Sequence, residues 1–101
     1  MNNDFGIYEK SYHLIVDCIK RYPEVEKAVI FGSRATGDYE KGSDIDIALF
    51  GDKITSDIRA AISAMINEVL PIPYFVDVLD YKSIKNEDLK EEIDRTGKRI
   101  V

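Results

Sequence analysis

The chain has 101 residues, of which 45% are hydrophobic and 33% are charged. This composition is typical of one globular domain spanning residues 1–101 and excludes a disordered or fibrous protein. The net charge of -5 and the scattered basic residues argue against a nucleic-acid-binding surface, and the single cysteine excludes a disulfide framework. No apolar run approaches the roughly 20 residues of a membrane span, and no signal peptide is apparent, so we expect a cytoplasmic protein.

The first half of the chain alternates between helical and extended patterns. A first helix should end near Arg21 or Tyr22, because apolar residues recur at helical spacing up to Pro23: Leu14, Ile15, Cys18 and Ile19. Residues 25–32 are β-branched and apolar toward their end, as in a buried strand. The short polar segment 33–37 is long enough for one helical turn, and the alternating segment 44–50 predicts a second strand.

The second half continues this alternation. Thr55, Ser56 and Asp57 offer N-cap groups for a helix whose apolar positions are Ile58, Ala61, Ile62, Met65, Ile66 and Val69. Residues 74–79 predict a third strand, and a last helix should begin near Ser83 or Asn86 and end at Gly97. The order α-β-α-β-α-β-α predicts an α/β fold with a small three-stranded sheet flanked by helices.

The first strand ends in a Gly32-Ser33 turn that leads into the helical turn. Such a turn leaves backbone N–H groups free, so it can hold a phosphate, with the Ser33 hydroxyl donating and Arg34 either adding a charged contact or facing solvent. The alternative is a plain strand-to-helix turn with Ser33 as the N-cap. A P-loop is excluded, because Asp38 and Tyr39 follow the second glycine where that motif needs a lysine and a hydroxyl residue.

Two aspartates, Asp44 and Asp46, share one face of the second predicted strand, because side chains alternate along a strand. Asp77 projects from a third strand that looks buried. Two such carboxylates repel by about 4 kcal/mol at 4 Å with an effective dielectric constant near 20, so three of them must either bind a cation or hold a proton. No lysine or arginine lies in these strands, which favours a divalent metal ion. Oxygen ligands favour magnesium, with manganese possible.

The alternative makes Asp44 a cap or turn residue and places Asp77 or Asp80 at a strand end facing water. For Asp80 we adopt this interpretation. His13 is expected to be an exposed helix residue and Cys18 a core residue.

A phosphate-binding turn beside metal-binding carboxylates suits transfer chemistry at a nucleoside triphosphate. Two metal ions held by Asp44 and Asp46 would assist the leaving pyrophosphate and lower the pKa of an attacking hydroxyl. Asp77 would then accept the proton of that hydroxyl.

Gly32-Ser33, ten residues and then Asp44-Ile45-Asp46 resemble the G-S-x10-D-x-D signature of the DNA polymerase beta-like nucleotidyltransferase superfamily. The resemblance is to its minimal nucleotidyltransferases, the MNT or MntA-like proteins, and covers nearly the whole chain. It implies a mixed sheet, Gly32 and Ser33 on the triphosphate of ATP, and Asp44, Asp46 and Asp77 as magnesium ligands.

The resemblance also implies a partner. Larger superfamily members carry extra domains that hold the acceptor, whereas the minimal group commonly pairs with a helical HEPN protein. In such a pair the nucleotidyltransferase, acting as antitoxin, adenylylates a tyrosine of the HEPN toxin. The alternatives are a transferase acting on a small-molecule or nucleic-acid acceptor, and a non-catalytic module that masks its partner. Base specificity and oligomeric state, including a homo-oligomer, stay open.

Overall fold

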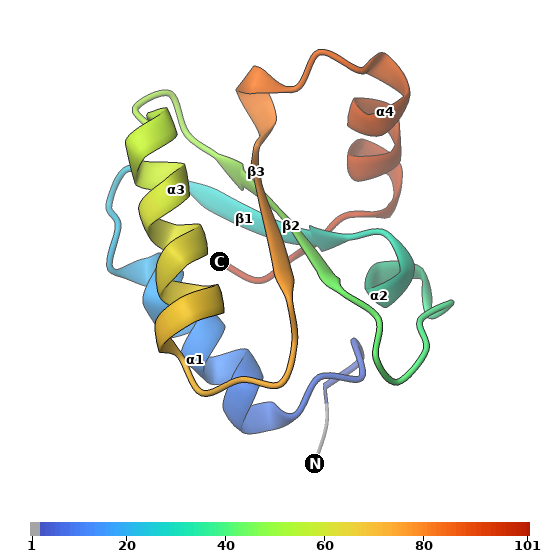
Figure 1. The fold of residues 1–101 in the computed structure, drawn as a ribbon. Coiled ribbons are helices and arrows are strands. Elements are labelled where there is room, and N and C mark those ends of the chain that lie inside the picture. The colour runs from blue at the N-terminus through green and yellow to red at the C-terminus, as the bar shows by residue number, and fades with distance from the viewer. Residues whose placement is uncertain (1–2) are drawn as a thin grey trace.

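A mixed four-stranded sheet forms the centre of the molecule, with helices on both of its faces (Figure 1). The computed structural model describes residues 3–101. The helices are α1 (Glu9–Lys20), α2 (Ser33–Thr36), α3 (Ser56–Ala64) and α4 (Glu87–Thr96), and the strands are β1 (Lys27–Phe31), β2 (Ile45–Phe50), β3 (Val76–Asp80) and β4 (Lys98–Arg99). A π-helical segment, η1 (Met65–Val69), extends α3, and a 3-10 turn, η2 (Tyr81–Ser83), follows β3.

The strand order in the sheet is β3-β2-β1-β4. β1 runs antiparallel to both β2 and β4, whereas β2 and β3 are parallel and place Asp46 beside Asp77. The prediction of a mixed sheet is confirmed, but the prediction of three strands is wrong by one. Strand β4 has no recognisable sequence pattern, because it has only two residues, both polar and exposed, directly after Gly97.

The two faces of the sheet are buried to different extents. α1, α3 and η1 cover one face with a large apolar core that includes Ile15, Ile30, Ile47, Ile62 and Val76. α4 covers only part of the other face, where Val29, Phe31, Ala48 and Ile93 form a smaller core. The strand alternation puts Asp46 on this second face, and α4 leaves that end of the sheet accessible (Figure 1).

The helix ends follow the predicted capping pattern. Thr55 Oγ1 accepts a hydrogen bond from the Ile58 amide at 3.2 Å, and Asn86 Oδ1 accepts one from the Leu89 amide at 3.2 Å. Ala61 and Val69 depart from the predicted apolar face: both are exposed, Val69 to 65%. For Val69 the reason is the π-helical turn of η1, which shifts the helical spacing on which that prediction rested. His13 is exposed and Cys18 is buried, as predicted. No helix within residues 3–101 combines the length and hydrophobicity needed to cross a bilayer.

Strand β3 is an edge strand whose outer backbone groups bond to side chains. The Asn67 amide accepts from the Val76 N–H and donates to the Val76 carbonyl, both at 2.8 Å. Arg59 Nη1 donates to the Val78 carbonyl at 3.2 Å. Side chains of η1 and α3 thus occupy the backbone hydrogen-bonding groups at this edge of the sheet, where a further strand could otherwise pair.

We expect Asn67→Ala to lower the free energy of unfolding by about 2 kcal/mol, because both polar backbone groups of Val76 lose their partners. Urea denaturation measures this. Glu68→Ala, at the exposed neighbouring position, should stay within about 0.5 kcal/mol of the wild type. Equal stabilities for the two variants would show that the Asn67 amide contributes nothing.

Candidate active site

The turn between β1 and α2 has a backbone that only glycine adopts readily. Gly32 has φ 74° and ψ −151°, and its carbonyl accepts hydrogen bonds from the Ala35 and Thr36 amides, both at 3.1 Å. The N–H groups of Ser33 and Arg34 are the first in the helix, where no helical carbonyl precedes them. Because α2 is only four residues long, these directed N–H groups, rather than a helix dipole, would provide the attraction for an anion.

Gly32 also touches the nearest carboxylate. A Cβ atom at Gly32 would lie 2.7 Å from Asp46 Oδ2. The missing side chain therefore lets the Asp46 carboxylate lie directly against the turn.

We expect Gly32→Ala to cost about 1–3 kcal/mol of stability and to displace the Asp46 carboxylate, because the alanine would combine a positive φ with the contact to Oδ2. Gly37→Ala is the matched control for backbone strain, since Gly37 has φ 89° but no atom within 4 Å of its Cβ position. Gly42→Ala, with neither feature, should be near neutral. Thermal unfolding of the three variants separates the cost of the positive φ from the cost of the contact with Asp46. Gly32→Ala no less stable than Gly37→Ala would contradict the proposed contact.

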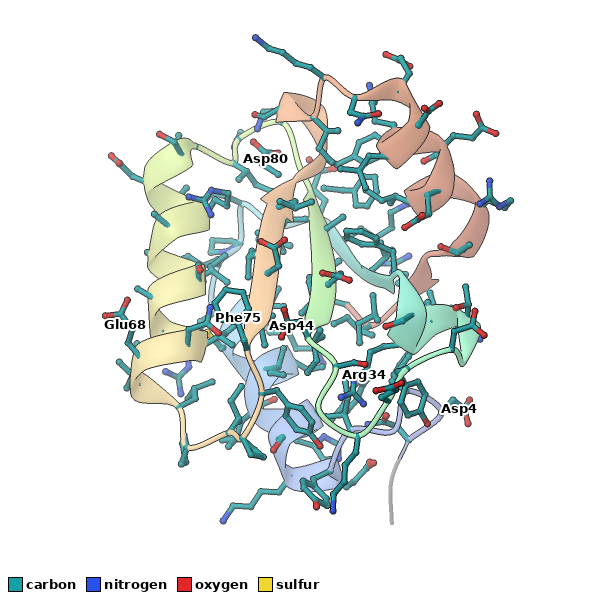
Figure 2. All side chains as sticks on the ribbon, turned by 45° about the vertical axis from the view of Figure 1, so that its right-hand side comes forward. Asp4, Arg34, Asp44, Glu68, Phe75 and Asp80 are labelled. Atoms are coloured by element: carbon teal, nitrogen blue, oxygen red, sulfur yellow. The ribbon has the colours of Figure 1, made fainter. Side chains whose placement is uncertain are left out.

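The sheet brings together the three aspartates singled out in the sequence. Asp46 and Asp77 are partners in the parallel register of β2 and β3, about 4.8 Å apart at the backbone. Asp44 lies one residue before β2 and is exposed (Figure 2). Asp77 is also exposed, although both of its neighbours in β3 are buried. Its carboxylate therefore reaches water, although it projects from a strand whose other side chains are mostly buried.

The charges of this group act on Asp46. Burial raises the pKa of the Asp46 carboxyl, and the nearby carboxylates of Asp77, Asp44 and Glu92 raise it further. A divalent cation would remove this repulsion, and carboxylate oxygens are the donors that magnesium prefers. The donor set therefore fits such an ion.

The side chains as they stand do not form a finished metal cage. Within residues 3–101, no three His, Cys, Asp or Glu side chains are grouped closely enough to hold an ion. Asp44 and Asp77 are exposed, so their rotamers can change at little cost. The three-carboxylate metal site remains a prediction.

A cavity of about 330 Å³ lies between the Gly32-Ser33 turn and α4. Glu92 and Arg95 line it from α4. Neither residue could be predicted from the sequence, because no local pattern links the last helix to a turn some 60 positions earlier. Arg95 is largely exposed and lies 3.8 Å from Glu91, so it can supply the positive charge that we had expected from Arg34.

Arg34 neither faces solvent nor lines this cavity. It is 1% exposed, and its guanidinium donates to the carbonyls of Phe5 and Gly6 at 3.1 Å and of Ser43 at 2.8 Å. Figure 2 shows Arg34 on the inner side of the loop that precedes β2. The sequence could not predict this, because the acceptors are backbone groups from two distant segments. We correct the assignment of Arg34 from a phosphate contact to an organiser of the loop.

Asp80 also differs from its prediction. It is 7% exposed rather than facing water, and Oδ2 accepts from Lys82 Nζ at 2.8 Å and from Ser83 Oγ at 3.0 Å. It stabilises the start of η2 and lies on the opposite face of β3 from Asp77.

Comparisons with known proteins agree with this architecture. The family model described as "Polymerase beta, Nucleotidyltransferase" matches residues 14–101. No curated protein sequence matches the chain.

Several solved structures share the fold. A chain of a toxin–antitoxin complex with AMP-PNP superposes with a TM-score of 0.71 at 23% identity, covering 87% of this chain and 70% of that one. A chain of the complex of a tri-AMPylated Shewanella oneidensis HEPN toxin with an MNT antitoxin gives 0.66 at 20% identity, covering 90% and 69%. These identities establish a common fold, and the family match establishes more: the chain belongs to the polymerase beta nucleotidyltransferase family.

Proposed function

We propose that this nucleotidyltransferase transfers AMP from ATP to a hydroxyl group of a protein acceptor in a magnesium-dependent reaction. One observation carries the proposal: Asp46, the register partner of Asp77, lies against the Gly32 turn. Repelling carboxylates beside free N–H groups form a site that suits a metal–triphosphate complex. As a further part of the proposal, residues 1–101 act as one domain in the cytoplasm.

Each residue has a role in the proposed reaction. The Ser33 N–H and hydroxyl would bind the phosphates that leave as pyrophosphate, with Arg95 adding positive charge. Asp44, Asp46 and Asp77 would hold magnesium, which when bound neutralises phosphate charge and makes the acceptor hydroxyl more acidic.

The bond changes follow from this arrangement. The acceptor oxygen forms a bond to the α-phosphorus as the bond to the bridging α–β oxygen breaks. The bridging oxygen keeps the electron pair and departs with pyrophosphate. Asp77 takes the proton of the acceptor hydroxyl.

We further propose that the acceptor is a tyrosine of a HEPN-domain partner and that the chain acts as an antitoxin. The fold shared with chains of MNT–HEPN complexes, one of which contains an AMPylated toxin, supports this choice. The AMP-PNP complex of another neighbour supports ATP as the nucleotide.

The test incubates the chain with ATP labelled at the α-phosphate, magnesium and a candidate HEPN-domain protein from the same source. We expect label on the HEPN protein, its loss on a Tyr→Phe change at the acceptor, and its loss when EDTA removes the magnesium. Label on RNA or on a small molecule without the HEPN protein would identify a different acceptor. Neutralisation of the toxin by Asp46→Asn as strong as by the wild type would indicate masking instead of catalysis.

A further inference from the structure

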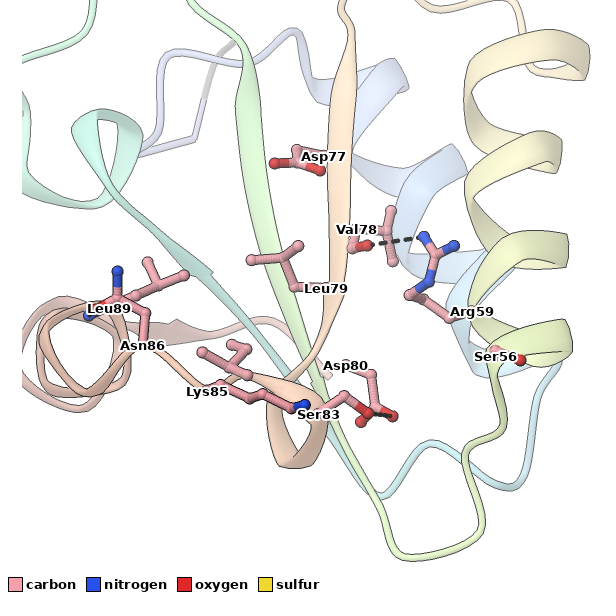
Figure 3. Close-up of a pocket in the computed structure, with 11 residues that line it drawn as sticks. Ser56, Arg59, Asp77, Val78, Leu79, Asp80, Ser83, Lys85, Asn86 and Leu89 are labelled. Carbon is pink, nitrogen blue, oxygen red and sulfur yellow. Dashed lines mark hydrogen bonds between the residues drawn. The ribbon is translucent and has the colours of Figure 1, made fainter.

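A second cavity, of about 480 Å³, begins at Asp77 and runs along β3 to the end of the strand (Figure 3). Its lining comes from β3, from residues 83–86 at the junction of η2 and α4, and from the first turns of α3 and α4, which form its two rims. This volume lies within the range of roughly 300–1,000 Å³ that proteins use for ligands. The Gly32-Ser33 turn and the 330 Å³ cavity do not belong to it.

The order of the strands determines which part of the reaction this cavity can serve. β1, which ends at the Gly32 turn, and β3, which carries Asp77, lie on opposite sides of β2 and Asp46. In a phosphoryl-type displacement the attacking and leaving oxygens are in line on opposite sides of the phosphorus. If pyrophosphate leaves on the β1 side, the acceptor must approach from the β3 side, where the cavity lies.

The lining indicates the chemistry of the occupant. Leu79, Ile84 and Leu89 are only partly buried and provide apolar walls. Two cations, Arg59 and Lys85, stand on the α3 and α4 sides. Figure 3 shows Leu79 pointing to the same side of β3 as Asp77, whereas the backbone carbonyl of Val78 accepts the hydrogen bond from Arg59. Apolar walls suit an aromatic ring, and the cations suit carboxylates beside it.

We propose that this cavity is the acceptor site and holds a tyrosine side chain within an acidic segment of the partner protein. The ring would lie against Leu79 and Leu89 with its hydroxyl toward Asp77, and flanking acidic residues would meet Arg59 and Lys85. The proposal rests on the proposed transferase function, but it assigns a surface and a type of sequence that the function alone does not specify.

The test fills the cavity without removing any of its contacts. Ser56 is an exposed residue on its rim, and the chain has no tryptophan, so Ser56→Trp blocks the cavity and adds a single fluorophore. A blue-shifted emission shows that the indole occupies the cavity. Ala61→Trp, exposed on α3 and outside the lining, is the matched control. Lys85→Glu reverses one rim charge, with Lys10→Glu on α1 as its control.

We expect Ser56→Trp to weaken binding of the HEPN protein and to raise its KM at least about tenfold. Lys85→Glu should raise the KM for the HEPN protein about threefold or more. The affinity for ATP should change less than about twofold in both variants. The two control variants should match the wild type. Weaker ATP binding in Ser56→Trp would make the cavity a nucleobase site, and unchanged acceptor binding would place the acceptor elsewhere; either result overturns the proposal.

The two proposals can fail separately. Wild-type chain that binds the HEPN protein without transferring AMP refutes the proposed reaction, and the cavity is then judged by the effect of Ser56→Trp on binding alone. Transfer that is unaffected by Ser56→Trp and Lys85→Glu refutes the cavity but leaves the reaction standing. Absence of both binding and transfer refutes both.

Discussion

Asp46→Asn should abolish AMP transfer and at the same time make the metal-free protein more stable. Asp46 lies between the Gly32 turn and Asp77, so its carboxylate is the group best placed to hold magnesium against the triphosphate. Removing an electrostatic contact to the transition state typically costs about 10²–10³-fold in rate. We expect at least that loss in single-turnover transfer of labelled AMP.

The gain in stability follows from the same charges. Burial and the carboxylates of Asp77, Asp44 and Glu92 raise the pKa of Asp46 in the folded protein. Between the ordinary value for aspartate, about 3.9, and the raised value, the folded state therefore binds more protons than the unfolded state. Stability falls as pH rises through that window, so the ionised carboxylate is a cost at neutral pH. Asparagine removes the cost, by about 1 kcal/mol or less since the side chain is partly exposed.

Urea denaturation in EDTA, repeated across the acidic range, measures this effect. The wild type should become less stable as pH rises above the ordinary aspartate pKa, whereas Asp46→Asn should not show this decrease. Magnesium should stabilise only the wild type. Asp17→Asn, an exposed change on α1, is the control for removing one negative charge. If Asp46→Asn were less stable than the wild type at neutral pH, the ionised carboxylate would stabilise the fold, and the proposed destabilisation by burial and by its acidic neighbours would be wrong.

The sequence predicted those parts of the site that depend on local pattern. The two-residue period placed Asp44 and Asp46 on one face, and the Gly-Ser turn after an apolar strand identified the possible phosphate-binding loop. Asp77, a carboxylate between the β-branched residues Val76 and Val78, indicated which strand lies beside Asp46 in the sheet. In each case the information lies within about ten residues.

The parts that sequence did not predict depend on contacts between distant segments. β4 exists because β1 has a free edge, and its own two residues show no strand pattern. Arg95 reaches the Gly32 cavity because α4 packs across the sheet. From its sequence position Asp80 is predicted to lie at a strand end and face water. In the structure Lys82 and Ser83 of the following turn bond to its carboxylate and bury it.

Arg34→Met should be the most destabilising single substitution considered for this chain, with a loss of at least about 3 kcal/mol. The guanidinium joins two segments that are distant in the sequence: it donates to the carbonyls of Phe5 and Gly6 and to those of Lys41 and Ser43. Methionine fills the volume but leaves these acceptors without their charged donor. A domain of this size has about 5–15 kcal/mol of stability in total, so the loss is large.

The shape of the guanidinium contributes as well as its charge. Its Cζ lies 4.8 Å from the ring centroid of Tyr39 and 5.1 Å from that of Tyr74, so the planar group lies over two aromatic rings. Lysine has no planar fork and cannot reach acceptors in both segments at once. We therefore expect Arg34→Lys to recover only part of the stability, although it restores the charge.

A combined measurement of stability and transfer separates the role of Arg34 from that of a phosphate ligand. Because Ser43 directly precedes Asp44, loosening its bond to Arg34 should displace that carboxylate, so Arg34→Lys should weaken magnesium dependence more than ATP affinity. Arg95→Met, which removes an exposed guanidinium, should change stability by less than about 0.5 kcal/mol but weaken ATP binding. Stable Arg34→Met protein with lost ATP affinity would reverse these assignments, because a phosphate ligand affects binding without holding the loop together.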